Sequence, residues 1–197
     1  MNKVRLEAFS DGVLAVIITI MVLEIKVPHG TDIQSLRPLL PVFVSYFLSF
    51  IYIAIYWNNH HHLMHSVKNI DWKVLWANMH LLFWLSLIPV ATGWMGENNF
   101  EKWPVVVYGI ILLMAAIAFT ILLYVLKNIH GQETILIQAI GNDKKGLVSS
   151  ILQAIGIGLS FVNPWIGISI FSFTAALWLV PNKRIEKILQ NENNSVQ

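Results

Sequence analysis

Six long apolar stretches, separated by short polar connections, limit what this chain can fold into. They cover approximately residues 6–27, 39–57, 72–95, 104–126, 146–161 and 165–180. A helix needs about 20 mainly apolar residues to cross the hydrocarbon core of a bilayer. The last two stretches are separated by Asn163-Pro164, which predicts a tight turn because proline cannot continue the preceding helix. The pattern predicts an all-α integral membrane protein with six transmembrane helices.

The composition agrees with this prediction and excludes several classes of protein. Charged residues make up 12% of the 197 residues and hydrophobic residues 56%, whereas soluble domains carry about 25% charged residues. The chain contains no cysteine, which excludes a disulfide framework, iron–sulfur clusters and thiolate zinc sites. The net charge of +2 is too small to indicate a nucleic acid as partner.

The six stretches leave little room for any domain outside the membrane. We expect one transmembrane domain over residues 1–181 and a short, polar, cytoplasmic tail over 182–197. The connection over 127–145 contains an apolar segment at 134–140, for which we expect an interfacial helix. If the N-terminus lies inside, ten of the 13 Lys and Arg residues lie on the inner side. Because positive charge accumulates on the cytoplasmic side, both termini are expected to be cytoplasmic.

The first stretch begins with ionisable residues, which are expensive inside a membrane and usually face protein or water. Arg5, Phe9, Ser10 and Asp11 form the pattern Arg-x-x-x-Phe-Ser-Asp. Arg5 and Asp11 are six residues apart, too far for the pairing of residues one helical turn apart. Each therefore needs other partners, unless Arg5 is a membrane-surface anchor and Asp11 a helix-end residue that faces water.

This pattern at the start of the first membrane helix resembles the signature of the transmembrane protein 175 family of potassium channels. Six predicted helices match one repeat of that family along the full chain, as in its bacterial members. The resemblance implies a homotetramer in the bacterial plasma membrane, with the first helix of each subunit lining a central pore. It also implies potassium as the permeant ion, no cofactor, the lipid bilayer as surroundings and no nucleic acid partner.

The resemblance assigns Val16, Thr19, Ile20 and Leu23 to the pore. Independently, positions 16, 20 and 23 form one stripe of a helix, although an apolar stripe in a membrane helix can also serve packing alone. Four such stripes around an axis would form a hydrophobic constriction that gates by dewetting. The chain contains no Thr-Val-Gly-Tyr-Gly filter. Potassium preference is therefore expected from the width of the apolar ring or from the Thr19 hydroxyl.

Arg5, Ser10 and Asp11 are interpreted as a polar brace between helices rather than as an ion site. The resemblance implies hydrogen bonds to polar side chains of neighbouring helices. Candidates at the end of the second stretch and in the third are Trp57, Asn58, Asn59, His60, Asn78 and His80. The sequence does not decide among them.

A membrane metalloenzyme is the first alternative function. His60, His61, His62 and His65 lie in one run, and His61 and His65 share a helix face on which they could bind one metal ion. Histidine-box enzymes need several such clusters, whereas this chain has seven histidines in all. We therefore expect no metal site, no catalytic residue and no enzyme activity.

A small secondary transporter is the second alternative. Pro89 in the third stretch and Gly156 and Gly158 in the fifth could interrupt helices, as at transporter substrate sites. No charged residue lies in the middle of a stretch to bind a coupling ion. Small residues such as Gly156, Gly158, Gly167 and Ser169 more simply allow close packing of helices.

Overall fold

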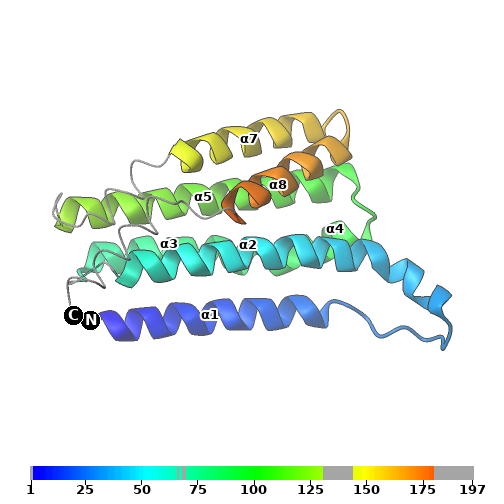
Figure 1. Cartoon of the computed structure of the whole chain (residues 1–197), viewed down its shortest axis with the longest axis horizontal. Helices are drawn as coiled ribbons and strands as arrows, with labels where there is room; N and C mark the ends of the chain where they lie inside the picture. Colours follow the sequence, from blue (N-terminus) through cyan, green and yellow to red (C-terminus); the bar gives the residue numbers. More distant parts are fainter. Residues whose placement is uncertain (1, 66, 68–69, 131–143, 180–197) are drawn as a thin grey trace.

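The chain folds into an elongated bundle of helices that run side by side (Figure 1). This computed structural model describes residues 2–65, 67, 70–130 and 144–179. The described residues form helices and connections without strands, which confirms the predicted all-α fold. The elements are α1 (Lys3–Leu23), the 3₁₀ helix η1 (Ile33–Leu39), α2 (Leu40–His65), α3 (Trp72–Ser86), α4 (Ile88–Glu97), α5 (Lys102–His130), α7 (Lys144–Ser160) and α8 (Pro164–Leu179).

Four segments are long and apolar enough to cross a membrane. They are Lys3–Leu23, Ile33–Met64, Trp72–Glu97 and Lys102–Ile129. Two shorter apolar helices follow, Lys145–Ser160 and Pro164–Leu179. All six correspond to predicted stretches, although several ends are shifted; for example, the first helix ends at Leu23 rather than at residue 27, and the second continues past Trp57 to His65.

The third predicted helix is interrupted. Leu87 ends α3 and begins α4, and Pro89 stands in the first turn of α4. Proline has no backbone N–H to donate to the preceding turn and its ring crowds that turn, so a continuous helix is broken here. The span 72–95 is therefore two consecutive helices rather than one.

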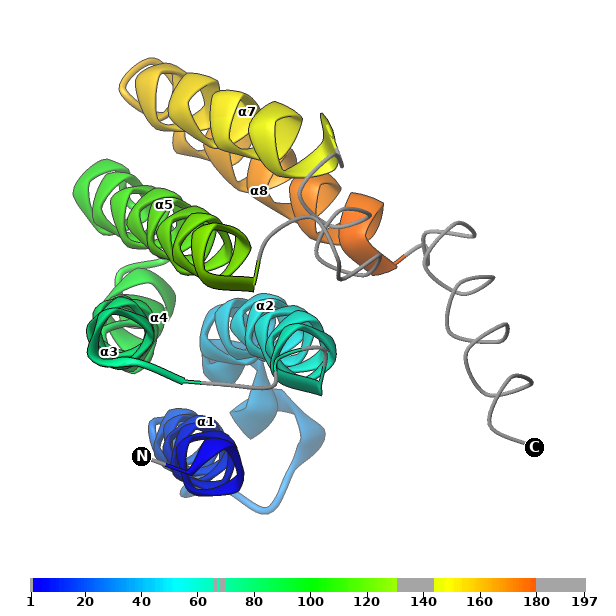
Figure 2. The ribbon, with the colours of Figure 1, turned by 90° about the vertical axis from the view of Figure 1, so that its left-hand side faces the viewer.

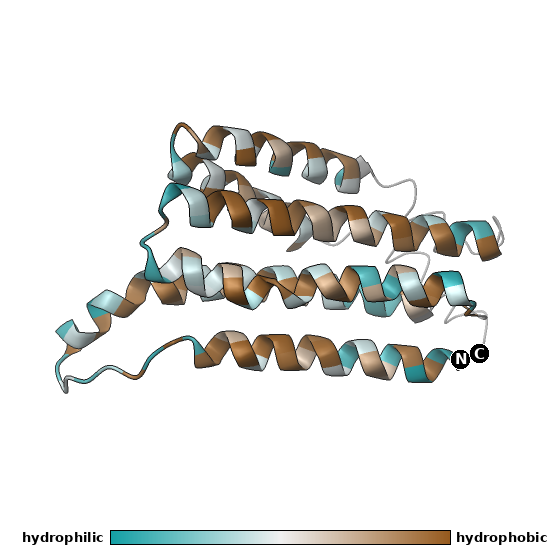
Figure 3. Cartoon of the chain, turned by 180° about the vertical axis from the view of Figure 1, so that it is seen from behind, coloured by the Kyte–Doolittle hydropathy of each residue, from teal (hydrophilic) through white to brown (hydrophobic). Residues whose placement is uncertain are grey.

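The helix α1 lies on one side of the layer formed by α2, α3 and α4, and α5, α7 and α8 lie on the other side (Figure 2). On one side α1 packs against α2, α3 and α4; on the other, α7 and α8 form a hairpin against α5. The core between them includes the fully buried side chains of Leu85, Met95, Tyr108 and Leu112. Hydrophilic residues gather at the two ends of the bundle, and apolar residues predominate along the middle of α5 (Figure 3).

Small residues explain how closely α7 and α8 approach each other. A Cβ atom at Gly167 would collide with Ser160 Oγ, and one at Gly156 would collide with the Phe171 ring. Gly158, by contrast, faces open space. Gly156 and Gly167 therefore serve packing, as the sequence predicted, whereas Gly158 does not. The predicted polar tail at 182–197 and the apolar segment at 134–140 lie outside the described residues.

Candidate functional site

One face of α1 is buried against the rest of the bundle. This packed face consists of Leu6, Ser10, Leu14, Ile17 and Met21. The spacing of three or four residues places these side chains in one row along the helix. The row contacts α2, α3 and α4, so the orientation of α1 about its own axis is defined by packing.

A buried chain of hydrogen bonds connects α1, α3 and α2. Asn78 Nδ2 on α3 donates to Ser10 Oγ over 2.9 Å, and Ser10 Oγ donates to the carbonyl oxygen of Leu6. His60 Nε2 on α2 lies 2.8 Å from Asn78 Oδ1. Since a carbonyl oxygen only accepts, His60 carries its proton on Nε2 and donates to Asn78. All three polar side chains are buried, so the chain of bonds is protected from competition by water.

A second, more exposed set of contacts lies beside the first. Trp57 Nε1 on α2 donates to Asp11 Oδ1 over 3.0 Å. The Trp57 ring stacks on His61, one turn further along α2, with ring centroids 6.0 Å apart. His61 Nδ1 in turn lies 3.1 Å from Glu7 Oε1 on α1. Two residues of α1, one turn apart, therefore meet two residues of α2, one turn apart.

The structure thus brings some of the candidate partners to the motif and leaves others elsewhere. Trp57, His60 and Asn78 join the brace. Asn59 donates to the carbonyl oxygen of Ile55 in its own helix, and His80 accepts from Trp84 in its own helix. Within the described part of the chain neither of these two bonds to the motif.

Glu7 was missed by the sequence analysis. The signal that could have found it is its spacing of four residues from Asp11, which repeats the spacing between Trp57 and His61. Arg5 is exposed, and no hydrogen bond or ion pair joins its side chain to another described residue. The brace within one chain therefore rests on Ser10 and Asp11, with Glu7 beside them.

The opposite face of α1 is exposed in the part of the chain that the structure describes. We call it the open face, and it comprises Arg5, Gly12, Val16, Thr19, Ile20 and Leu23. The side chains of Val16, Ile20 and Leu23 are exposed by 55%, 45% and 78%. Thr19 Oγ1 donates to the carbonyl oxygen of Val16, so its hydroxyl oxygen keeps lone pairs for another partner.

A Cβ atom at Gly12 would meet nothing within 4 Å. Phe9 is also exposed, by 49%.

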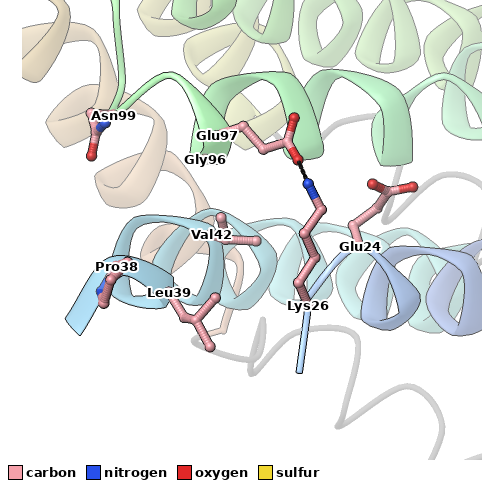
Figure 4. Close-up of a pocket in the computed structure, with 8 residues that line it drawn as sticks. All are labelled: Glu24, Lys26, Pro38, Leu39, Val42, Gly96, Glu97 and Asn99. Carbon is pink, nitrogen blue, oxygen red and sulfur yellow. Dashed lines mark hydrogen bonds and ion pairs between the residues drawn. The ribbon is translucent and has the colours of Figure 1, made fainter. Parts of the chain in front are cut away.

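Beyond Leu23 the chain is attached to α4 by an ion pair (Figure 4). Lys26 Nζ lies 2.6 Å from Glu97 Oε1, and both side chains are substantially exposed. The hydrogen bond and the negative charge of Glu97 raise the pKa of the Lys26 amine above its ordinary value. Glu24 and Val42 line the same surface cavity of about 410 Å³. The two ends of α1 are therefore held by different chemistry, a buried polar network at one and an exposed ion pair at the other.

The histidine run does not assemble a metal site among the described residues. No three His, Asp or Glu side chains there lie close enough together to hold a metal ion. His60 bonds to Asn78 and His61 pairs with Glu7, while the side chain of His65 lies outside the described part. His60 and His61 thus serve contacts between helices.

Fold and site together define a multi-pass helical membrane protein whose first helix is braced on one side and open on the other. Residues 5–89 match the family described as the endosomal/lysosomal potassium channel TMEM175. A potassium channel of Chryseobacterium sp. (strain P1-3) is 54% identical over 190 residues, which cover 96% of this chain and 99% of that protein. The chain belongs to the TMEM175 family of potassium channels.

More distant relatives agree with this membership. A potassium channel of Chamaesiphon minutus is 30% identical over 84% of this chain and 88% of its own length. The crystal structure of a lysosomal potassium-selective channel TMEM175 homolog from Chamaesiphon minutus superimposes with a TM-score of 0.77, at 29% identity, over 90% of this chain and 96% of that one. The human relative, named an endosomal/lysosomal proton channel, is 28% identical, and the match covers 30% of its length.

These matches confirm the resemblance drawn from the first helix. They support the channel interpretation over the metalloenzyme and the transporter, because the matched family and relatives are ion channels. Several apolar helices in a family of membrane channels make this a multi-pass membrane protein.

Proposed function

We propose that this chain is one subunit of a homotetrameric potassium channel, in which the open faces of four α1 helices surround a central pore. The observation that carries the proposal is the composition of the open face. Arg5, Gly12 and Thr19 lie on it together with exposed Val16 and Leu23. Intervals of seven residues nearly complete two helical turns, so these residues form one line along the helix.

Lipid is a poor neighbour for such a face. A charged side chain within a membrane span is costly and usually faces protein or water. A face that presents Arg5 at one end and a hydroxyl near the other therefore fits a path shared with other subunits better than a surface covered by lipid. The same assembly would give the Arg5 side chain, which has no partner among the described residues, a neighbouring subunit to contact.

The apolar members of the open face form the proposed gate. Val16, Ile20 and Leu23 would each occur four times around the axis, and a narrow apolar ring resists hydration. Leu23 is the most exposed of the three. Thr19 lies between these rings with a free hydroxyl lone pair toward the path, which makes it the candidate for contact with dehydrating potassium ions.

The packed face has the complementary role. The bonds from Ser10 to Asn78 and from Asp11 to Trp57 hold α1 at a defined rotation, which keeps its open face toward the axis. We place the channel in the bacterial plasma membrane with both termini cytoplasmic, because that orientation puts ten of the 13 Lys and Arg residues inside. Permeation is passive and needs no cofactor or catalytic residue.

The test is ion flux through the purified protein in liposomes, with Leu23→Asn and Val22→Asn as matched variants. Both residues are exposed in the single chain, but Val22 points about 100° away from Leu23 around the helix. We expect potassium flux to exceed sodium flux in the unaltered protein and a larger organic cation to be excluded. Leu23→Asn makes the ring wettable and should raise flux several-fold while reducing discrimination between potassium and sodium.

Val22→Asn should leave both quantities close to those of the unaltered protein. Equal effects of the two variants, or no effect of Leu23→Asn on flux, would show that this face of α1 does not line the pore. Cross-linking of the reconstituted protein should give a tetramer, and a monomer that conducts would contradict the proposed assembly.

A further inference from the structure

A second cavity lies on the other side of the bundle from α1. It measures about 480 Å³, is partly open to the surroundings and is lined by residues of α2, α5, α7 and α8. Figure 2 shows α5, α7 and α8 on the far side of α2 from α1. Nothing in the proposed ion path uses this cavity, because none of the residues of the open face lines it. Its volume falls within the range of about 300–1,000 Å³ that is typical of sites for one small molecule.

The lining is mainly apolar and carries no charge. Ile55, Phe119, Leu123 and Trp178 represent its apolar wall, and none of its 17 lining residues is Asp, Glu, Lys, Arg or His. An ionised group would lose its hydration here without gaining a countercharge. A bound phosphate or carboxylate is therefore disfavoured, whereas a hydrocarbon chain is favoured.

The polar groups of the wall are mostly engaged in hydrogen bonds with the protein. The Tyr52 hydroxyl donates to the carbonyl oxygen of Phe171 over 2.7 Å. Thr120 Oγ1 donates to the carbonyl oxygen of Ala116. Ser149 Oγ accepts from Trp178 Nε1 over 2.9 Å. These groups need no ligand to satisfy them.

Gln153 is the exception. Its side chain is 3% exposed and lines the cavity. Gln153 lies within hydrogen-bonding reach of the Tyr52 hydroxyl, yet its Oε1 atom has no hydrogen-bond partner in the described part of the chain. A buried carbonyl oxygen without a donor is unfavourable, and the N–H or O–H group of a ligand would satisfy it.

We propose that this cavity binds one uncharged, single-chain amphiphile whose hydroxyl head donates a hydrogen bond to Gln153 Oε1. Long-chain alcohols and monoacylglycerols have this chemistry. The hydrocarbon chain lies against the wall formed by α5 and α2, and the head occupies the place opposite Tyr52. The site is separate from the pore, and its occupation does not depend on ion conduction.

Photolabelling of the full-length protein in lipid nanodiscs tests the proposal. The probes are a long-chain alcohol with a photoactivatable group in its chain and the methyl ether of the same alcohol. The ether can accept but not donate a hydrogen bond, so it cannot satisfy Gln153 Oε1. We expect saturable labelling of peptides from α5 and α7, with half-saturation at a concentration about three- to tenfold lower for the alcohol than for the ether.

Gln153→Leu should remove this preference, because the carbonyl acceptor is gone while the apolar volume remains. Gln34→Leu is the matched control, since it makes the same change at an exposed position of η1 remote from the cavity; it should keep the preference. Equal half-saturation of alcohol and ether in the unaltered protein would overturn the proposal. So would labelling that avoids α5 and α7, or a preference that survives in Gln153→Leu.

If Gln153→Leu does not fold, the comparison of alcohol and ether in the unaltered protein still decides the question. Potassium flux measured on the same sample separates the two proposals. A sample that conducts without preferring the alcohol would refute the amphiphile site alone. A sample that binds the alcohol and does not conduct would refute the channel assembly alone.

Discussion

The packed and open faces of α1 both carry large apolar side chains, but these side chains meet different surroundings. Ile17 and Ile20 illustrate the contrast, because they are the same residue type, three positions apart in one helix. Ile17 is 3% exposed and Ile20 is 45% exposed. In lipid, apolar side chains gain little from contact with other apolar side chains, so hydropathy alone does not choose which face turns inward.

The polar residues make the choice. Ser10 and Asp11, on or beside the packed face, bond to Asn78 and Trp57. Thr19 on the open face bonds only to its own helix among the described residues. A few hydrogen bonds between helices therefore determine which apolar face of α1 packs against the bundle and which stays exposed for the proposed pore. Substitutions on the packed face should therefore change stability, and substitutions on the open face should change conduction.

The largest difference in stability is expected between Ile17→Ala and Ile20→Ala. Ile17 belongs to the buried core, and its truncation leaves a cavity that costs about 2–5 kcal/mol. Ile20→Ala removes the same atoms from the open face and should change stability far less. The measurement is the midpoint of thermal unfolding of each variant in detergent. Equal losses for the two variants would break the distinction between the faces.

A smaller loss is expected from Asn78→Leu. The substitution removes the donor to Ser10 and the acceptor from His60. It leaves His60 Nε2 buried without its partner, at a cost of about 1–3 kcal/mol, while Ser10 keeps its bond to the carbonyl oxygen of Leu6. Asn58→Leu makes the same change at an exposed position of α2 and serves as control. The thermal midpoint should fall for Asn78→Leu and stay near that of the unaltered protein for Asn58→Leu.

A double-mutant cycle sharpens this prediction. Once Asn78 is Leu, the further change Ser10→Ala should cost less than it does in the unaltered protein, because the bond between the two residues is already lost. Strict additivity of the two changes would show that this bond does not hold α1 against α3.

The smallest effect is expected from Lys26→Gln at the other end of α1. The ion pair with Glu97 is exposed, and such pairs contribute little and weaken with salt. Glu97 raises the pKa of Lys26 above its ordinary value of 10.5. The stabilisation from a raised lysine pKa is fully present at lower pH and is lost as pH rises through the pKa of Lys26 in the folded protein.

The difference in thermal midpoint between the unaltered protein and Lys26→Gln should therefore be small at neutral pH and low salt. It should vanish at high salt, and also at a pH above the raised pKa of Lys26. Lys102→Gln, at an exposed position at the start of α5, controls for loss of a positive charge alone. A difference that persists at high salt would mean that Lys26 acts by packing rather than by charge.

The amino-acid sequence by itself determined the class of fold. Six apolar stretches of nearly membrane-spanning length predict helices because each helix satisfies its own backbone hydrogen bonds in lipid. The pattern over Arg5, Phe9, Ser10 and Asp11 indicated the family, and the comparisons confirmed it. Both signals are local, since each depends on residues a few positions apart.

The contacts between helices were decided only by the tertiary structure. Ser10 and Asn78 are 68 positions apart, and Asp11 and Trp57 are 46 apart. Whether two such residues meet depends on how each helix is rotated and shifted against its neighbours. The spacing of apolar residues within one helix does not specify this. For this reason Asn59, one residue before His60, looked like an equal candidate but points to its own helix.

The Gln153 Oε1 atom is a second feature that the amino-acid sequence did not predict. In sequence Gln153 is one polar residue in a glycine-containing apolar helix. Its position in a cavity follows from the way α7 and α8 lean on α5 and α2. Helix periodicity is a property of neighbouring residues, whereas a cavity exists only after four separate helices have packed, so the structure alone places an acceptor without a donor there.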